Sequence, residues 1–88
     1  MAYEVLTTKK FDKQLKKLDN QIKIMVSEWI LKNLVDTEDP RLHGSALVGN
    51  LKGYWRYRIG AYRLIVEIHD EELTILAVEI EHRSEVYK

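Results

Sequence analysis

The stretch GYWRYRIGAYRLIVEIHDEELTILAVEIEHRSEVYK, from Gly53 to Lys88, decides the fold. It predicts three consecutive β-strands, because its segments alternate in polarity and are rich in aromatic and β-branched residues. Only Gly60 and Ala61 separate the first two segments, which predicts a two-residue hairpin turn. We expect the strands at Tyr54–Ile59, at Tyr62–Ile68 and from Leu73 to about Arg83.

A turn of this length also sets which side chains share a face of the sheet. It pairs Arg58 with Arg63, and paired residues of an antiparallel hairpin lie on the same face. One face is apolar and is expected to form a core, from Trp55, Tyr57, Ile59, Tyr62, Leu64, Val66 and Ile68. The other face carries Arg56, Arg58, Arg63 and Glu67. Opposed like charges destabilise a hairpin, so this face indicates either an anionic ligand or a solvated surface neutralised by nearby glutamates.

The third segment places its apolar and charged residues on opposite parities. Leu76, Val78 and Ile80 have one parity, and Glu79, Glu81 and Arg83 have the other. If the apolar set joins the core, Arg83 lies on the face of Arg63. A two-residue loop at Asp70-Glu71 would give the opposite parity, so we expect an odd-length loop or a bulge near that turn.

The residues before the hairpin predict a short strand and two helices. We expect a strand from Tyr3 to Thr7, a helix capped by Thr7 or Thr8, and a second helix from Asp19 or Asn20 to about Leu34. Apolar residues recur at helical spacing in the two helices, namely Phe11, Leu15 and Leu18, and then Ile22, Met25, Val26, Trp29, Ile30 and Leu34. The expected fold is α+β: an N-terminal strand, an α-helical hairpin and a C-terminal antiparallel three-strand meander. The helices should pack on the apolar sheet face and leave the arginine face open.

Length and composition limit the class of protein. Eighty-eight residues predict a single domain over 1–88, and the absence of cysteine excludes disulfides and thiolate metal sites. No segment resembles a signal peptide, and no apolar run approaches the ~20 residues of a membrane-spanning helix. We therefore expect a cytoplasmic protein that does not bind membranes. The three histidines are far apart in the chain and no nucleotide-binding motif is present, so we expect neither a metal nor another cofactor.

The net charge is zero, but the charges are segregated along the chain. Arg41 to Arg63 contains five basic residues and no acid, whereas Leu64 to Glu81 contains six acids and neither lysine nor arginine. Residues 9–17 add five lysines, which form either a solvated helix surface or a patch that contacts phosphates. Such segregation predicts one surface for a polyanion and another for a basic partner.

The run W-R-Y-R-I-G-x-Y-R-L-I, an acidic turn, and then H-R-S-E-V-Y resemble the RelE/ParE superfamily of bacterial type II toxins. The resemblance spans nearly the whole chain and fits best the RelE branch, whose members are ribosome-dependent mRNA endonucleases. It implies a RelE-like, microbial-ribonuclease-type fold and an enzyme that cleaves mRNA by metal-free attack of the 2′-hydroxyl, inhibiting translation. The implied partners are a RelB-like antitoxin, the ribosome and mRNA.

The same resemblance implies an active site that contains Arg63, Arg83 and Tyr87. Arg63 would hold the scissile phosphate, Arg83 would stabilise the leaving side or assist its protonation, and Tyr87 would stack on a base. The lysine pair that the family carries on its second strand appears here as Arg56 and Arg58. Arginine is permanently charged and is a poor general base, so another group must accept the proton.

Histidine suits acid–base work near neutral pH, which makes His82 the candidate for that role. Strand parity turns His82 away from Arg83, so it would need an irregular strand end to reach the site. Further residues are expected to bind RNA: Lys52, Tyr54, Arg56 and Arg58 from the sheet, and Lys13, Lys16 and Lys17 from the first helix.

Two alternatives to the nuclease remain open. One is a ParE-like toxin that inhibits DNA gyrase by binding it. The other is a weak or inactive module that binds an antitoxin, which is suggested by Glu81, a position where relatives usually carry glycine. A carboxylate there would pair with Arg83 and weaken phosphate binding.

Overall fold

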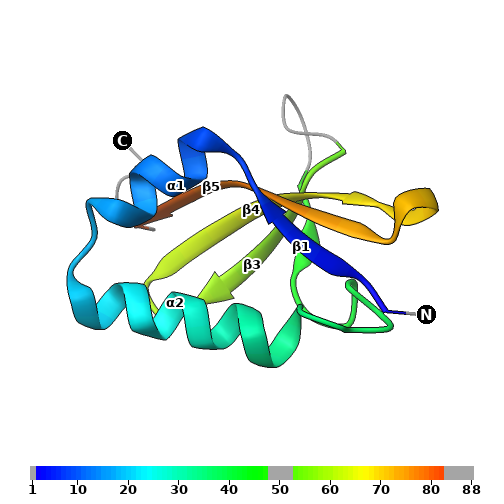
Figure 1. Ribbon diagram of the computed structural model, residues 1–88, viewed down its shortest axis with the longest axis horizontal. Coiled ribbons are helices and arrows are strands. Elements are labelled where there is room, and N and C mark those ends of the chain that lie inside the picture. Colours follow the sequence, from blue (N-terminus) through cyan, green and yellow to red (C-terminus); the bar gives the residue numbers. More distant parts are fainter. Residues whose placement is uncertain (1, 48–52, 83–88) are drawn as a thin grey trace.

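The computed structural model describes residues 2–47 and 53–82, and within them it contains two α-helices and five strands. The strands form one sheet in the order β1-β5-β4-β3-β2 (Figure 1). In chain order the elements are β1 (Glu4–Thr7), α1 (Lys9–Lys16), α2 (Asn20–Asn33), β2 (Ser45–Ala46), β3 (Trp55–Ile59), β4 (Tyr62–His69), the short 3-10 helix η2 (Asp70–Glu72) and β5 (Thr74–His82). The expected α+β class is confirmed.

The β3–β4 hairpin has the register that the sequence predicts. Arg58 pairs with Arg63 and Tyr57 with Leu64, across a turn formed by Gly60 and Ala61. Gly60 has a positive φ of 58°, a conformation that glycine adopts without strain. The two-residue turn and the alternation of the strands thus agree, and the apolar face lies toward the helices.

The predicted irregularity exists, but it lies in β5 rather than near the turn. The loop between β4 and β5 has four residues, 70–73, and it ends at Leu73 with a positive φ of 51°. The register then shifts by one residue: Ile65 pairs with Glu79, but Val66 pairs with Ala77. Val78 is the extra residue of this bulge, which reverses the parity of the strand beyond it.

The bulge corrects the predicted core of β5. Ile75, Ala77 and Ile80 are the buried residues of this strand, whereas Leu76 and Val78 are only partly buried and lie outside the core. Before the bulge the odd-numbered residues of β5 face the core, and after it the even-numbered residues do. The expectation that Leu76, Val78 and Ile80 face inward together is therefore right only for Ile80.

The N-terminal strand makes the sheet mixed rather than antiparallel. β1 pairs with β5 in parallel, from Glu4 opposite Thr74 to Thr7 opposite Ala77. Thr8 then caps α1, because its hydroxyl accepts a hydrogen bond from the backbone N–H of Phe11 at 3.1 Å. α1 continues along the edge of β5, where the Gln14 side chain accepts from the backbone N–H of Ile80 at 2.8 Å. The short strand β2, which pairs with β3, was not predicted from the sequence.

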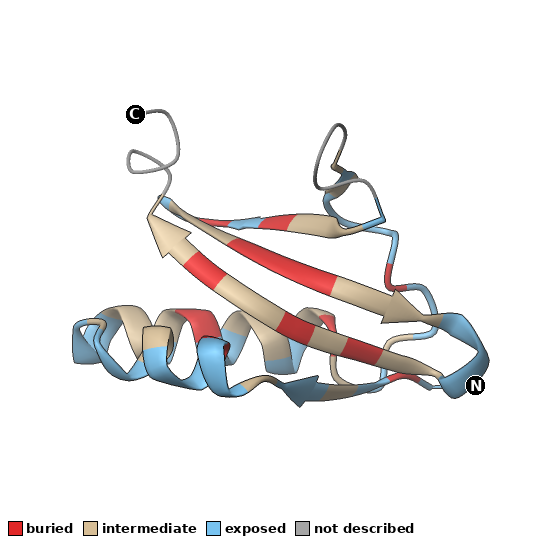
Figure 2. Ribbon diagram, turned by 90° about the horizontal axis from the view of Figure 1, so that it is seen from above, coloured by how far each residue is buried: buried red, intermediate tan, exposed pale blue. Residues whose placement is uncertain are grey.

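Both helices lie on one side of the sheet and share its core (Figure 2). The sheet contributes Tyr57, Ile59, Leu64, Val66, Ile75, Ala77 and Ile80, and the segments outside it contribute Tyr3, Phe11, Val26 and Leu34. The apolar face predicted for the second helix is confirmed, since all of its members are either buried or packed against this core. Within the described residues no helix covers the opposite face of the sheet, and none is long and apolar enough to cross a bilayer.

Candidate functional site

The face of the sheet turned away from the helices carries a row of charges across three strands. Arg58 of β3 is directly opposite Arg63 of β4, which in turn is directly opposite Glu81 of β5. The next row along the sheet runs from Arg56 through the buried Ile65 to Glu79. Like charges in directly opposed positions repel, so the Arg58–Arg63 pair favours an anion at this place.

Arg63 is the least exposed of the arginines in this row. Its side chain is 12% exposed, and its guanidinium Nη2 lies 3.6 Å from the Glu81 carboxylate. Its buried Nε has no hydrogen-bond partner within residues 2–47 and 53–82. Guanidinium donors match the oxygens of phosphate, so the terminal nitrogens of Arg63, rather than the enclosed Nε, are the groups that suit an oxyanion.

The two arginines of β3 differ in their surroundings. Arg58 is exposed at the surface. Arg56 is half-buried, and its Nη2 donates to the hydroxyl of Ser45 at 3.1 Å, across the β2–β3 pair. Ser45 therefore orients the Arg56 side chain on this face, a contact that the sequence did not indicate.

The loop that leads into β2 is held tightly on the core. The buried Tyr57 hydroxyl donates to the carbonyl of Pro40, and Trp55 Nε1 donates to the carbonyl of His43 at 2.7 Å. Gly44 has a φ of +83°, and a Cβ at this position would lie 2.2 Å from the carbonyl oxygen of Arg56. Glycine is required here both by the backbone conformation and by the close approach of β3.

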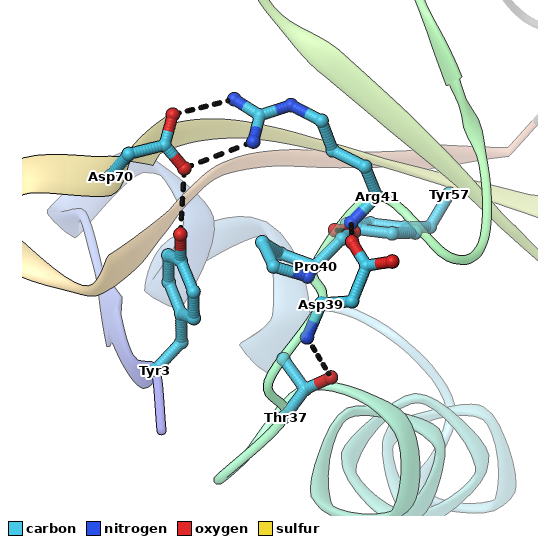
Figure 3. A network of polar contacts seen from close by, with 7 residues as sticks. All are labelled: Tyr3, Thr37, Asp39, Pro40, Arg41, Tyr57 and Asp70. Carbon is cyan, nitrogen blue, oxygen red and sulfur yellow. Dashed lines mark hydrogen bonds and ion pairs between the residues drawn. The ribbon is translucent and has the colours of Figure 1, made fainter. Parts of the chain in front are cut away.

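A second set of polar contacts ties the same loop to the β4–β5 turn (Figure 3). Arg41 donates two hydrogen bonds to the Asp70 carboxylate, at 2.9 and 3.0 Å, and the Tyr3 hydroxyl donates a third at 2.7 Å. The hydrogen bonds from Arg41 and then from Tyr3 lower the pKa of Asp70 to about 2. The Arg41 guanidinium also lies 6.0 Å from the centre of the Trp55 ring. No local pattern could have paired Arg41 with Asp70, which are 29 residues apart.

One lysine of α1 reaches the face of the sheet that carries the arginines. Lys10 forms an ion pair with Glu79 across the edge of β5, and its hydrogen bond to that carboxylate raises the pKa of Lys10. Lys13, Lys16 and Lys17 are exposed, as predicted for the polar side of the helix.

His82 lies on the opposite face from Arg63. It pairs with Tyr62 at the end of β5, and the two rings pack edge to face with their centres 5.1 Å apart. Both line a shallow pocket of about 410 Å³ between α1 and β5, together with Gln14, Lys17, Leu18, Ile80 and Glu81. The structure thus does not bring His82 to the arginine row.

Three predicted site residues, Lys52, Arg83 and Tyr87, lie outside the described residues. Tyr54 is described; it is half-buried directly before β3, and its carbonyl accepts from Leu47 N–H at 3.1 Å. In the described ranges, no three His, Asp or Glu side chains gather in a way that could hold a metal ion.

Comparison with known proteins identifies the family of the chain. Residues 5–87 match the family model described as the ParE toxin of the type II toxin–antitoxin system parDE. The chain is 32% identical to the toxin RelG of Mycobacterium tuberculosis over 88 residues, which is 100% of this chain and 99% of that protein.

Two solved structures share the fold. The toxin–antitoxin complex RelBE2 of Mycobacterium tuberculosis contains a chain with a TM-score of 0.85 and 31% identity, over 96% of this chain and 94% of that one. The isolated RelE toxin of E. coli has a TM-score of 0.74 at 23% identity, over 98% and 92% of the two chains.

Proposed function

The chain belongs to the ParE toxin family of type II toxin–antitoxin systems, and from this premise we propose that it is a ribosome-dependent endonuclease that cleaves mRNA. The observation that carries the proposal is the opposition of Arg58 and Arg63 on a sheet face that no helix covers within the described residues. A protein that binds its target only through apolar contacts has no need of two arginines at directly opposed strand positions beside a half-buried third, Arg56.

The chemistry that fits this face is attack of a 2′-hydroxyl on the neighbouring phosphorus atom. A P–O bond forms to the 2′-oxygen and the bond to the 5′-oxygen breaks, which leaves a 2′,3′-cyclic phosphate and a 5′-hydroxyl. Negative charge grows on the phosphate oxygens during this step, and Arg63 stabilises that charge through bonds that strengthen in the transition state. Arg58 and Arg56 hold the flanking phosphates of the RNA backbone.

The remaining roles follow the family resemblance. Arg83 stabilises the leaving oxygen or assists its protonation, and Tyr87 stacks on an unpaired base. A proton must also be removed from the 2′-hydroxyl. The acid–base role predicted for His82 requires the end of β5 to rearrange when RNA binds, because His82 packs against Tyr62 on the other face.

The test is to map mRNA cut positions on translating ribosomes with the wild-type protein and with Arg63→Ala. We expect Arg63→Ala to lose at least about 100-fold in cleavage, as is typical when an oxyanion-stabilising group is removed. Lys32→Ala is the matched control, because Lys32 is exposed on α2, away from the arginine face, and the charge change is the same. Cleavage by Arg63→Ala at the rate of the control would refute the assignment, provided that both variants melt as cooperatively as the wild type.

A second candidate function is inhibition of DNA gyrase, which the match to the ParE family model favours. A DNA supercoiling assay with the purified protein decides between the two, since a ribosome-dependent nuclease leaves supercoiling unchanged. Under either function we propose a RelB-like antitoxin as the partner that neutralises the toxin. The RelBE2 protein of Mycobacterium tuberculosis, which is similar over nearly its whole length, was solved as such a complex.

A further inference from the structure

We infer that Glu81 is a built-in competitor of the substrate phosphate: its carboxylate forms a loose ion pair with Arg63 in the free protein and is displaced when a phosphate binds. The inference deepens the proposed function, since it rests on Arg63 as the phosphate-binding group. It assigns to Glu81 a role in setting the affinity for the phosphate, and no part in the chemical step.

The first support is the position of Glu81 in the sheet. It is the residue of β5 directly opposite Arg63, on the face that carries Arg58 and Arg56. Arg63 is flanked by a cation on one side and an anion on the other. Glu81 thus supplies the only negative charge in the row of Arg58, Arg63 and Glu81.

The second support is that the pair is loosely made. The shortest distance between the guanidinium of Arg63 and the carboxylate of Glu81 is 3.6 Å, longer than the ~2.7–2.9 Å of a charge-assisted hydrogen bond. Arg63 Nε, which is buried, has no partner within the described ranges. Glu81 therefore compensates the charge of Arg63 at more than hydrogen-bond distance, and an anion that accepts hydrogen bonds from the terminal Nη groups binds more strongly.

A phosphate diester meets that condition. Its two non-bridging oxygens can accept two parallel hydrogen bonds from one guanidinium, and its charge also interacts favourably with the exposed Arg58. The Glu81 side chain is 30% exposed, so its carboxylate can turn toward solvent when a phosphate displaces it. Because Glu81 stays on the same face of the sheet, its negative charge still repels the bound phosphate, and this repulsion lowers the affinity of the site.

The neighbouring ion pair provides a matched control. Glu79 lies two residues before Glu81 on the same strand and face, and it pairs with Lys10 of α1. Lys10 is 60% exposed, and Ile65 rather than Arg63 is opposite Glu79. Glu79→Gln therefore makes the same change in charge on the same strand without freeing Arg63.

The experiment is a titration with inorganic phosphate, followed through the Nε–H resonance of Arg63 in ¹⁵N-labelled protein at constant ionic strength. The resonance is assigned by its absence in Arg63→Lys. We expect the phosphate Kd of Glu81→Gln to be about 3- to 10-fold lower than that of the wild type, and Glu79→Gln to stay within about twofold. If Glu81→Gln does not fold, Glu81→Thr replaces it, because a β-branched residue suits a strand position.

Equal phosphate affinity in the wild type and the Glu81 variant would overturn the inference, and so would an Arg63 resonance that phosphate does not move. With ribosomes and mRNA, Glu81→Gln should lower KM by a similar factor and leave kcat unchanged. A large loss of kcat would instead make Glu81 a participant in proton transfer and would also overturn it. If phosphate binds tighter to Glu81→Gln but no variant cleaves mRNA, the competition stands and the nuclease function falls.

Discussion

Tyr57→Phe is the substitution for which the structure gives the sharpest expectation. Tyr57 is fully buried, its hydroxyl donates to the carbonyl of Pro40, and its ring packs 5.3 Å from the ring of Trp29. Phenylalanine keeps the ring and its packing but removes the donor. The carbonyl of Pro40, itself a buried residue, then loses its partner inside the protein.

The expected loss of stability follows from the Pro40 carbonyl, which is left without a hydrogen-bond donor. Leaving a buried hydrogen-bonding group without its partner costs about 1–3 kcal/mol. A domain of this length has a total free energy of unfolding of roughly 4–13 kcal/mol, so the loss is a substantial fraction of it. The corresponding fall in Tm is roughly 4–24 °C. The free energy would be measured by urea denaturation followed through tryptophan fluorescence, since Trp29 lies against Tyr57.

The matched control is Tyr54→Phe, which removes the same atom from a half-buried residue just before β3 and should change stability by less than about 0.5 kcal/mol.

Burial raises the pKa of the Tyr57 phenol above its usual 10.0. A raised pKa gives stability that is fully present below pH 10 and is lost as the pH rises further. The difference between the wild type and Tyr57→Phe should therefore shrink above pH 10. A loss below about 0.5 kcal/mol at neutral pH, or a difference that grows at high pH, would refute this reasoning.

Two further predictions concern the loop and the turn that hold β3. Gly44→Ala should destabilise the protein by about 2 kcal/mol or more in urea denaturation, because of the positive φ and the 2.2 Å approach to the Arg56 carbonyl. Gly53→Ala, at a φ of +100° with nothing within 4 Å of the added carbon, isolates the backbone strain and should cost less. The Asp70 carboxylate, with its pKa lowered to about 2, contributes stability above about pH 4 that is lost as the pH falls toward 2. Between these pH values the Tm of the wild type should fall more steeply than that of Asp70→Asn, and parallel curves would contradict the role of the Arg41–Asp70 pair.

The hairpin could be predicted because two independent local signals specify the same register. A two-residue turn at Gly60 and Ala61 permits few alignments, and a slip by one residue would turn every apolar side chain of β3 outward. The opposition of Arg58 and Arg63 follows from this register alone. The arginine half of the candidate site was therefore readable from the sequence.

The course of β5 could not be predicted, because its irregularity is set by segments distant in the chain. β1 pairs with β5 only as far as Ala77. Beyond that point the Thr8 hydroxyl, rather than a strand, contacts β5: it donates toward the carbonyls of Ala77 and Val78 at 3.2 Å each. The bulge at Val78 lies where the element beside β5 changes from the strand β1 to the helix α1. Thr8 is 70 residues from Val78, so no window of local sequence contains both sides of this junction.

The bulge also decides what lies opposite Arg63. If the register between the turn and Ala77 continued unchanged, Ile80 would be opposite Arg63, and Glu81 would point to the core. The one extra residue at Val78 shifts the pairing so that Ile80 is buried at 3% exposure and Glu81 is opposite Arg63. The two cations of the site thus come from a local hairpin, whereas their counter-ion depends on the packing of β1 and α1 against β5. A shift of β5 into the unbroken register would leave the arginine pair in place and turn Glu81 away from it, whereas deletion of Val78 would remove the bulge and keep Glu81 opposite Arg63.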